Sequence, residues 1–146
     1  MKIDLSNLDK IVNPVYKIIF RYTGRYLVLF GGAGSGKSWG IAEKIIVRAL
    51  TEDNHNILCV RKTGNTIHRS QFALLQATIN SWGLSDYFQV NEAEGKEKIV
   101  CKLNDNKIIF AGLDDVEKLK SIYNITSVWL EECSEIEFTD YLEIDR

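Results

Sequence analysis

The sequence has little proline and cysteine, with one and three residues, and no long apolar stretch. The scarcity of proline is typical of a folded rather than a disordered chain. Its apolar runs are far shorter than the about 20 residues that a transmembrane helix needs, and the start Met1–Asp4 lacks the apolar core of a signal peptide. Cys59, Cys101 and Cys133 are widely spaced among apolar neighbours, so we expect buried thiols rather than disulfides or a zinc site. These absences predict a cytoplasmic protein without membrane contact.

A strong charge of either sign is also missing. The 146 residues carry a formal net charge of −2 at pH 7, and 45% of them are hydrophobic. That composition is typical of one globular domain with a substantial core. The balanced charge argues against a general nucleic-acid binder, although a local basic patch is compatible with it.

Glycine, by contrast, is concentrated in one place. The stretch Gly31-Gly32-Ala33-Gly34-Ser35-Gly36-Lys37-Ser38 matches the phosphate-loop pattern G-x-x-x-x-G-K-[ST]. In such a loop the backbone N–H groups point at an anion, and the following helix adds its positive N-terminal end. We therefore predict that these residues bind the phosphates of ATP, with Lys37 on the β and γ phosphates and Ser38 on Mg²⁺. A flexible glycine turn with an isolated lysine is the weaker interpretation, because the loop stands between an expected strand and an expected helix.

The flanks of this loop supply the expected core. The apolar run 26–30 predicts a buried parallel strand, residues 38–50 have helical spacing, and residues 56–60 predict a second buried strand, which makes a strand–helix–strand unit. The remaining expected elements are a helix over 66–82, strands over 87–90, 98–103 and 107–110 in an antiparallel ribbon, a short capped helix over 114–120 and a strand over 125–130. We expect residues 1–24 to be a partly extended lead-in and residues 25–146 to form the nucleotide-binding core.

Charged residues follow two of the expected strands. Arg61 comes after residues 56–60, at the edge where parallel sheets bind ligands, and either contacts phosphate or is a solvated arginine. Glu131 and Glu132 come directly after residues 125–130. Because strand neighbours point to opposite sides, one carboxylate can approach a metal ion while the other faces an attacking water. We assign Glu131 to Mg²⁺ and Glu132 to the water, which makes Glu132, Lys37 and Arg61 the candidate catalytic residues.

In combination, several stretches resemble the large terminase subunit of tailed phages. They are Gly31–Ser38, Val60–Thr63, Ile108–Asp115 followed by Lys118–Ser121, and Val128–Glu132. The likeness runs from about Arg25 to the end of the chain. It implies an α/β fold of the P-loop NTPase class, of the additional-strand, catalytic-glutamate type. Such a fold has a mainly parallel sheet flanked by helices, here with an antiparallel β-ribbon.

The resemblance also implies a function. Members of that family hydrolyse Mg·ATP to drive double-stranded viral DNA into a preformed shell in the host bacterial cytoplasm. Their partners are the portal protein and the small terminase subunit, and they act as a homo-oligomeric ring. They continue into a nuclease domain, whereas this sequence stops at Arg146, so we expect an incomplete core and no nuclease activity. Ala33 stands where family members often have an arginine, which leaves the source of a charge-neutralising arginine open.

Three other functions stay open at this point. The chain could bind a nucleotide without turnover, because strands of the full domain are missing. A small-molecule or nucleotide kinase would need an arginine-rich lid, which the sequence after Arg69 lacks. A helicase-like P-loop ATPase is the closest enzymatic alternative, and it would normally show several further strand-end motifs after the paired acids Glu131 and Glu132.

Overall fold

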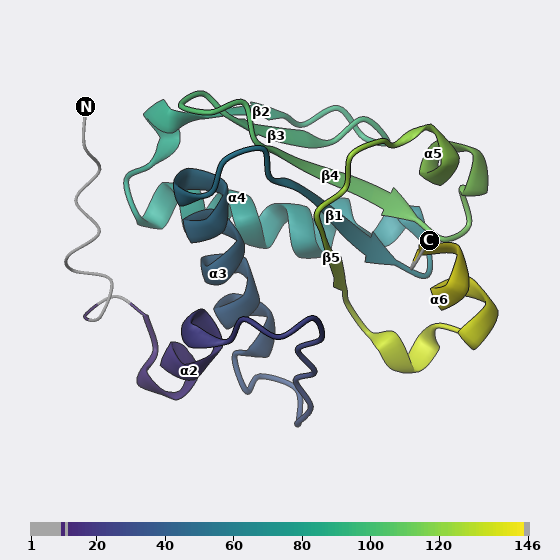
Figure 1. Ribbon diagram of the computed structural model, residues 1–146, viewed down its shortest axis with the longest axis horizontal. Coiled ribbons are helices and arrows are strands. Elements are labelled where there is room, and N and C mark those ends of the chain that lie inside the picture. Colours follow the sequence, from purple (N-terminus) through teal and green to yellow (C-terminus); the bar gives the residue numbers. More distant parts are fainter. Residues whose placement is uncertain (1–9, 11, 145–146) are drawn as a thin grey trace.

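The protein, seen here as a computed structural model, is described at residue 10 and over residues 12–144 (Figure 1). Its strands are β1 (Asn56–Arg61), β2 (Phe88–Asn91), β3 (Lys98–Cys101), β4 (Lys107–Gly112) and β5 (Ser127–Leu130). Its α-helices are α2 (Lys17–Arg21), α3 (Lys37–Thr51), α4 (Ala73–Ser81), α5 (Val116–Ser121) and α6 (Phe138–Ile144). A π-helical turn, His68–Phe72, leads into α4, and short 3₁₀ turns lie at Pro14–Tyr16, Gly64–Thr66, Ser85–Tyr87 and Cys133–Glu135.

The five strands form one mixed sheet in the order β2-β3-β4-β1-β5. β1 lies between β4 and β5 and is parallel to both, with Val60 opposite Ala111 on one side and Leu130 on the other. β2 and β3 are antiparallel, and β3 is antiparallel to β4. The expected antiparallel ribbon is therefore present, but β4 also belongs to the parallel part. The carboxyl ends of β1, β4 and β5 meet at one edge of the sheet, so the residues that follow them are brought together there.

Both faces of the parallel strands are covered, which explains why β1 is apolar without interruption. Ile57 and Cys59 face a core that α3 and α4 complete with residues such as Ile46 and Leu75. Leu58 and Val60 point to the other face, into a smaller cluster with Ala111 and Leu113 of the β4 end and partly buried residues of α5 and α6. In Figure 1, α3 and α4 lie together on one side of the sheet, and α5 and α6 lie near the C-terminal end. The expected α/β class is confirmed.

The strand expected over residues 26–30 is wrong. This segment is irregular, and Val28 and Phe30 are 78% and 93% exposed. A β-strand exists only by exchanging backbone hydrogen bonds with a neighbouring strand, and none of the described strands pairs with it. The expected strand–helix–strand unit is therefore also absent. The parallel neighbours of β1 are β4 and β5 instead.

Two smaller expectations also need correction. Residues 14–21 of the lead-in are helical rather than extended, and Tyr16 and Ile19 are buried. Cys59 and Cys101 are buried as expected, but Cys133 is exposed, because it lies in the turn after β5 rather than in a strand. No described helix is long and apolar enough to cross a membrane.

His55 lies just before β1, at the opposite edge of the sheet from the carboxyl ends, and contacts Asn106 and Thr126, which precede β4 and β5. Its backbone N–H donates to Asn106 Oδ1 at 2.7 Å, and its Nδ1 lies 2.7 Å from Thr126 Oγ1. The side chain is buried, with Glu52 Oε2 at 3.3 Å. Burial lowers the pKa of His55, the Arg48 charge lowers it further, and the Glu52 charge opposes both.

This depressed pKa predicts a stability that depends on mildly acid pH. The unfolded chain, in which His55 has its ordinary pKa of about 6.5, binds a proton more readily than the folded one, so stability is lost as pH falls through that value. We expect the free energy of unfolding, measured by urea titration, to drop between about pH 7.5 and 5.5. His55→Gln should flatten this drop, whereas His68→Gln, which leaves His55 in place, should retain it. An equal drop in parent and His55→Gln would contradict the assignment.

Candidate functional site

The glycine-rich loop lies directly before α3. Gly31, Gly34 and Gly36 have φ angles of 146°, 75° and 84°, in the region that side chains rarely adopt. These three glycines let the chain curl and enter the helix at Lys37. The first N–H groups of an α-helix have no partner within the helix, and a helix N-terminus that directly follows such a loop is an arrangement that binds anions.

The Lys37 ammonium lies within this loop. Its Nζ donates to Gly31 O at 2.8 Å, to Gly32 O at 2.9 Å and to Ser35 Oγ at 3.0 Å. The side chain is therefore folded back over the loop that precedes it. The Lys37 ammonium is thus held at the loop that the sequence predicts to bind phosphates.

Ser38 connects the loop to the sheet. Its Oγ donates to Glu131 Oε1 at 2.9 Å, although the two residues are 93 positions apart. Glu131 N–H donates to Val60 O at 3.1 Å, so the residue after β5 is still held by β1. The second carboxylate oxygen, Oε2, is buried and accepts no hydrogen bond from the described residues. A hydroxyl and a carboxylate with a spare oxygen are the ligands Mg²⁺ prefers, so Ser38 and Glu131 fit such an ion and would hold it.

Arg61 lies against both acids. It forms an ion pair with Glu132 Oε2, and its Nε is 3.9 Å from Glu131 Oε2. The Arg61 side chain is only 14% exposed, so it is not a solvated arginine. Glu132 has a φ of 55°, in the left-handed region, and its side chain is half-exposed. Because β5 ends at Leu130, strand alternation does not set the direction of Glu132. Its left-handed backbone and the pairing with Arg61 do so instead.

The negative charge of the Glu131 carboxylate also affects the thiol of Cys59 inside the core. Burial raises the pKa of the Cys59 thiol well above its ordinary value, and the Glu131 carboxylate raises it further. Cys59 pairs with Trp129 in the β1–β5 register, two residues before Glu131. The thiol of Cys59 is therefore neutral and inert rather than a nucleophile.

Gln71 contacts the strand that carries Glu131, a role that was not expected from the sequence. It is fully buried in the π-helical turn, and its Nε2 donates to Trp129 O at 3.1 Å. Its spacing was the available signal, because Gln71, Leu75 and Ile79 are four residues apart and share the buried helix face. A lone amide on an apolar face needs a buried partner, and here the partner is a carbonyl of β5.

Tyr16 also has a larger role than its place in the lead-in indicated. Its hydroxyl donates to Ser35 O, and its ring covers the junction between the loop and α3. A Cβ added to Gly40 would lie 2.7 Å from Tyr16 Cγ, so Gly40 is needed for this close contact. The lead-in segment is thereby attached to the phosphate loop.

This packing predicts an inverted effect of alanine at position 40. In a helix interior, Gly→Ala normally stabilises by about 1 kcal/mol. In the parent protein Gly40→Ala should instead lower the midpoint of thermal unfolding, because the methyl group collides with the Tyr16 ring. In a Tyr16→Ala background the same substitution should raise the midpoint. Gly40→Ala stabilising both backgrounds equally would show that the ring does not occupy this position.

A loop of this sequence, leading into a helix beside the carboxyl ends of parallel strands, defines an α/β fold of the P-loop NTPase-like class. The solved large terminase of a thermophilic bacteriophage is similar, with a TM-score of 0.64 and 15% identity over 79% of this chain and 29% of that one. A structure of the same phage terminase in complex with ADP is also similar, with a TM-score of 0.62, 15% identity and coverage of 79% and 28%.

Sequence comparison identifies the family. The family model described as phage terminase large subunit matches residues 23–145. The PBSX phage terminase large subunit of Bacillus subtilis (strain 168) is 34% identical over 137 residues, which are 92% of this chain and 30% of that protein. The large terminase subunit of Bacillus phage SPP1 is 31% identical over 121 residues, 80% of this chain and 28% of that protein. The chain belongs to the phage terminase large-subunit family, and it spans less than a third of the length of these relatives.

Proposed function

We propose that this chain binds and hydrolyses Mg·ATP as the ATPase part of a viral DNA-packaging motor. The observation that carries the proposal is the hydrogen bond from Ser38 to Glu131, which places the hydroxyl of the phosphate loop on the carboxylate that follows β5. Family membership and the likeness to a terminase in complex with ADP support it. The loop would bind the phosphates through its N–H groups, and Lys37 would exchange its loop oxygens for those of the β and γ phosphates.

The two carboxylates would have separate tasks. Ser38 and Glu131 would hold Mg²⁺, which when bound neutralises charge on the phosphates. Glu132 would orient a water molecule and accept its proton as the water oxygen bonds to the γ-phosphorus. The bond from that phosphorus to the bridging oxygen breaks, and ADP and inorganic phosphate leave. Arg61, already in contact with both acids, would lie at the place where negative charge builds up.

The role in a motor rests on the family. We propose that double-stranded viral DNA is the translocated substrate, that the portal protein and the small terminase subunit are partners, and that copies of the large subunit form a ring in the host cytoplasm. The remaining parts of the relatives, more than two thirds of their length, would contribute to these activities.

A second function, nucleotide binding without turnover, is favoured by one observation. Glu132, the proposed water-orienting residue, is tied to Arg61 by an ion pair. A carboxylate held in this way is turned toward the guanidinium rather than toward a water molecule. Steady-state ATPase measurements beside a binding measurement distinguish the two functions.

Substitutions in the site should separate binding from hydrolysis. Lys37→Ala removes the ammonium from the loop and should lower Mg·ATP affinity about a hundredfold in calorimetry, without unfolding the protein.

Glu131→Gln should weaken the dependence on Mg²⁺, and Glu132→Gln should retain affinity but lose hydrolysis, because Glu132 alone acts on the water. Glu94→Gln, on an exposed turn between β2 and β3, is the matched control. Hydrolysis by Glu132→Gln at the parental rate would refute the division of roles.

The position of Arg61 leads to a prediction about the rate of ATP hydrolysis. An arginine at the transferred phosphoryl group contributes about 10³ to 10⁵ in rate, and Ala33 supplies none from the loop. We expect the dilute chain to bind ATP but to hydrolyse it very slowly. If Arg61 acts within its own chain, the specific rate should be independent of protein concentration and be abolished by Arg61→Ala. If a neighbouring copy provides the arginine, the specific rate should rise with concentration. Fast, concentration-independent hydrolysis that survives Arg61→Ala would exclude both arrangements.

A further inference from the structure

Gln71 is a polar side chain in a place where packing favours an apolar one. It is 0% exposed in the π-helical turn before α4, and its neighbours Phe72 and Leu75 belong to the apolar core. Its Nε2 donates to Trp129 O at 3.1 Å, but its Oε1 is buried and accepts no hydrogen bond from the described residues. A buried acceptor without a donor costs free energy, so core stability does not explain this amide.

The turn that carries Gln71 departs from a regular helix. Phe72 N–H donates to Ile67 O at 3.2 Å, across five residues rather than the four of an α-helix. Such π-turns are rare, and they occur frequently at functional sites. Both the unmet oxygen and the unusual turn indicate a role for Gln71 beyond packing.

The carbonyl that Gln71 contacts lies two residues before Glu131. β5 is the last strand in the sheet order, so β1 is its one neighbour among the described strands. Glu131 N–H donates to Val60 O, which continues the strand pairing by one residue beyond β5. Residues two apart in a strand point to the same face, so Trp129 and Glu131 share the face that α3 and α4 cover. Gln71 is therefore a second support for the end of β5, from the helix side.

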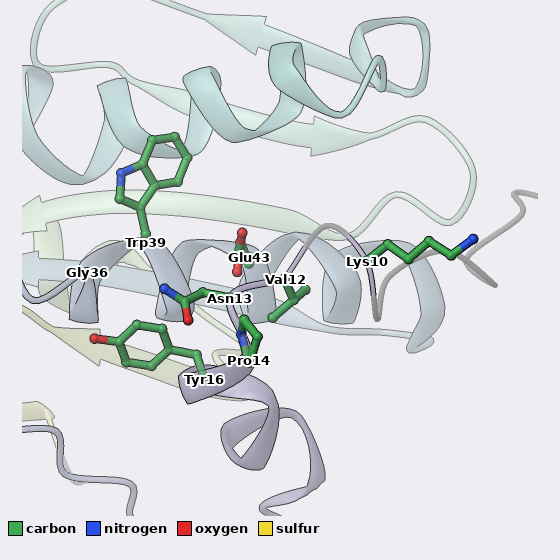
Figure 2. Close-up of a pocket in the computed structure, with 8 residues that line it drawn as sticks. All are labelled: Lys10, Val12, Asn13, Pro14, Tyr16, Gly36, Trp39 and Glu43. Atoms are coloured by element: carbon green, nitrogen blue, oxygen red, sulfur yellow. The ribbon is translucent and has the colours of Figure 1, made fainter.

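The opposite end of the Ser38–Glu131 contact is held independently of Gln71. Figure 2 shows Tyr16 beside the start of α3, near Gly36. A Cβ added to Gly36 would lie 3.2 Å from Tyr16 Cε2, so the ring packs closely onto the start of the helix. Ser38 is thus fixed by the packing of α3, whereas Glu131 depends on the end of a short edge strand.

The direction of the Glu131 carboxylate matters because only one of its oxygens is bound. Oε1 accepts from Ser38 Oγ at 2.9 Å. Oε2 is buried and accepts no hydrogen bond from the described residues, and Arg61 Nε, 3.9 Å away, is too far to donate one. A carboxylate oxygen binds a cation in this place only while the carboxylate stays turned toward it.

We propose that Gln71 is a positioning residue for the cation site. Its amide holds the carbonyl of Trp129 and thereby fixes the direction in which Glu131 presents its free oxygen to Mg²⁺. The proposal rests on the proposed Mg·ATP binding, because Glu131 must be a ligand for its direction to matter. Groups that orient a metal ligand commonly change metal affinity by about 10- to 100-fold. Gln71 acts here only through β5 and Glu131.

The test measures, by calorimetry, the affinity of the ADP complex for Mg²⁺ and the affinity for ADP in EDTA. Gln71→Met keeps the length of the side chain and removes both polar atoms. It should lower Mg²⁺ affinity about tenfold and leave ADP affinity in EDTA unchanged. The midpoint of thermal unfolding without Mg²⁺ should not fall, because an acceptor without a donor is removed and Trp129 keeps its place opposite Cys59 in the sheet. Parental Mg²⁺ affinity overturns the proposal, whatever the midpoint.

A double variant tests whether Gln71 acts through Glu131. In the Glu131→Gln background, Gln71→Met should cause no further loss of Mg²⁺ affinity, whereas additive losses would overturn the positioning role, also if the midpoint has fallen. Thr78→Val is the matched control. Thr78 is likewise a fully buried polar residue of α4, but its hydroxyl donates to Leu74 O within its own helix, so this variant should bind Mg²⁺ as the parent does.

Failure of the underlying function has a different signature. If Glu131→Gln retains the parental Mg²⁺ affinity, the assignment of Glu131 to the cation is refuted, and the role of Gln71 with it. If Glu131→Gln weakens Mg²⁺ binding and Gln71→Met does not, only the role of Gln71 is refuted.

Discussion

The hydrogen bond between Ser38 and Glu131 is the contact on which the candidate site depends. One end is fixed because α3 packs Ile46 and neighbouring residues onto the sheet, and the other because Glu131 N–H is held by Val60 O. Neither end could move without disturbing the core or the β1–β5 pairing. Packing of the apolar core thus sets the distance between a hydroxyl and a carboxylate that are far apart in the chain.

Charge is balanced within the site before any ligand enters. Lys37 is compensated by loop oxygens and Arg61 by Glu131 and Glu132, so each positive group already has partners. Entry of phosphates and a cation would exchange these contacts for others of similar kind.

The relation between sequence and structure differs from segment to segment. Residues 56–60 and 38–50 carry strong local signals, an apolar run and an amphipathic repeat, and the strand and helix formed there with one more residue at the end of the strand and one more at each end of the helix. Residues 26–30 carry an equally good strand signal but are exposed, because a strand also needs a neighbour and none of the described strands provides one. Glu132 shows the same limit on a smaller scale. The direction of the Glu132 side chain follows from a left-handed backbone conformation just after β5, and no pattern of side chains in the sequence predicts that conformation.

By itself, the sequence determined the chemistry: a loop of glycines before a lysine and a serine, two acids after an apolar strand, and an arginine at another strand end. These are local properties, because backbone freedom and hydrogen-bonding groups belong to the residues that carry them. Only the tertiary structure decided the partners: Ser38 with Glu131, Arg61 with Glu132, and Tyr16 with the loop and Gly40. Those contacts depend on strand order and on which helix face is buried, and both are settled by packing across the whole domain.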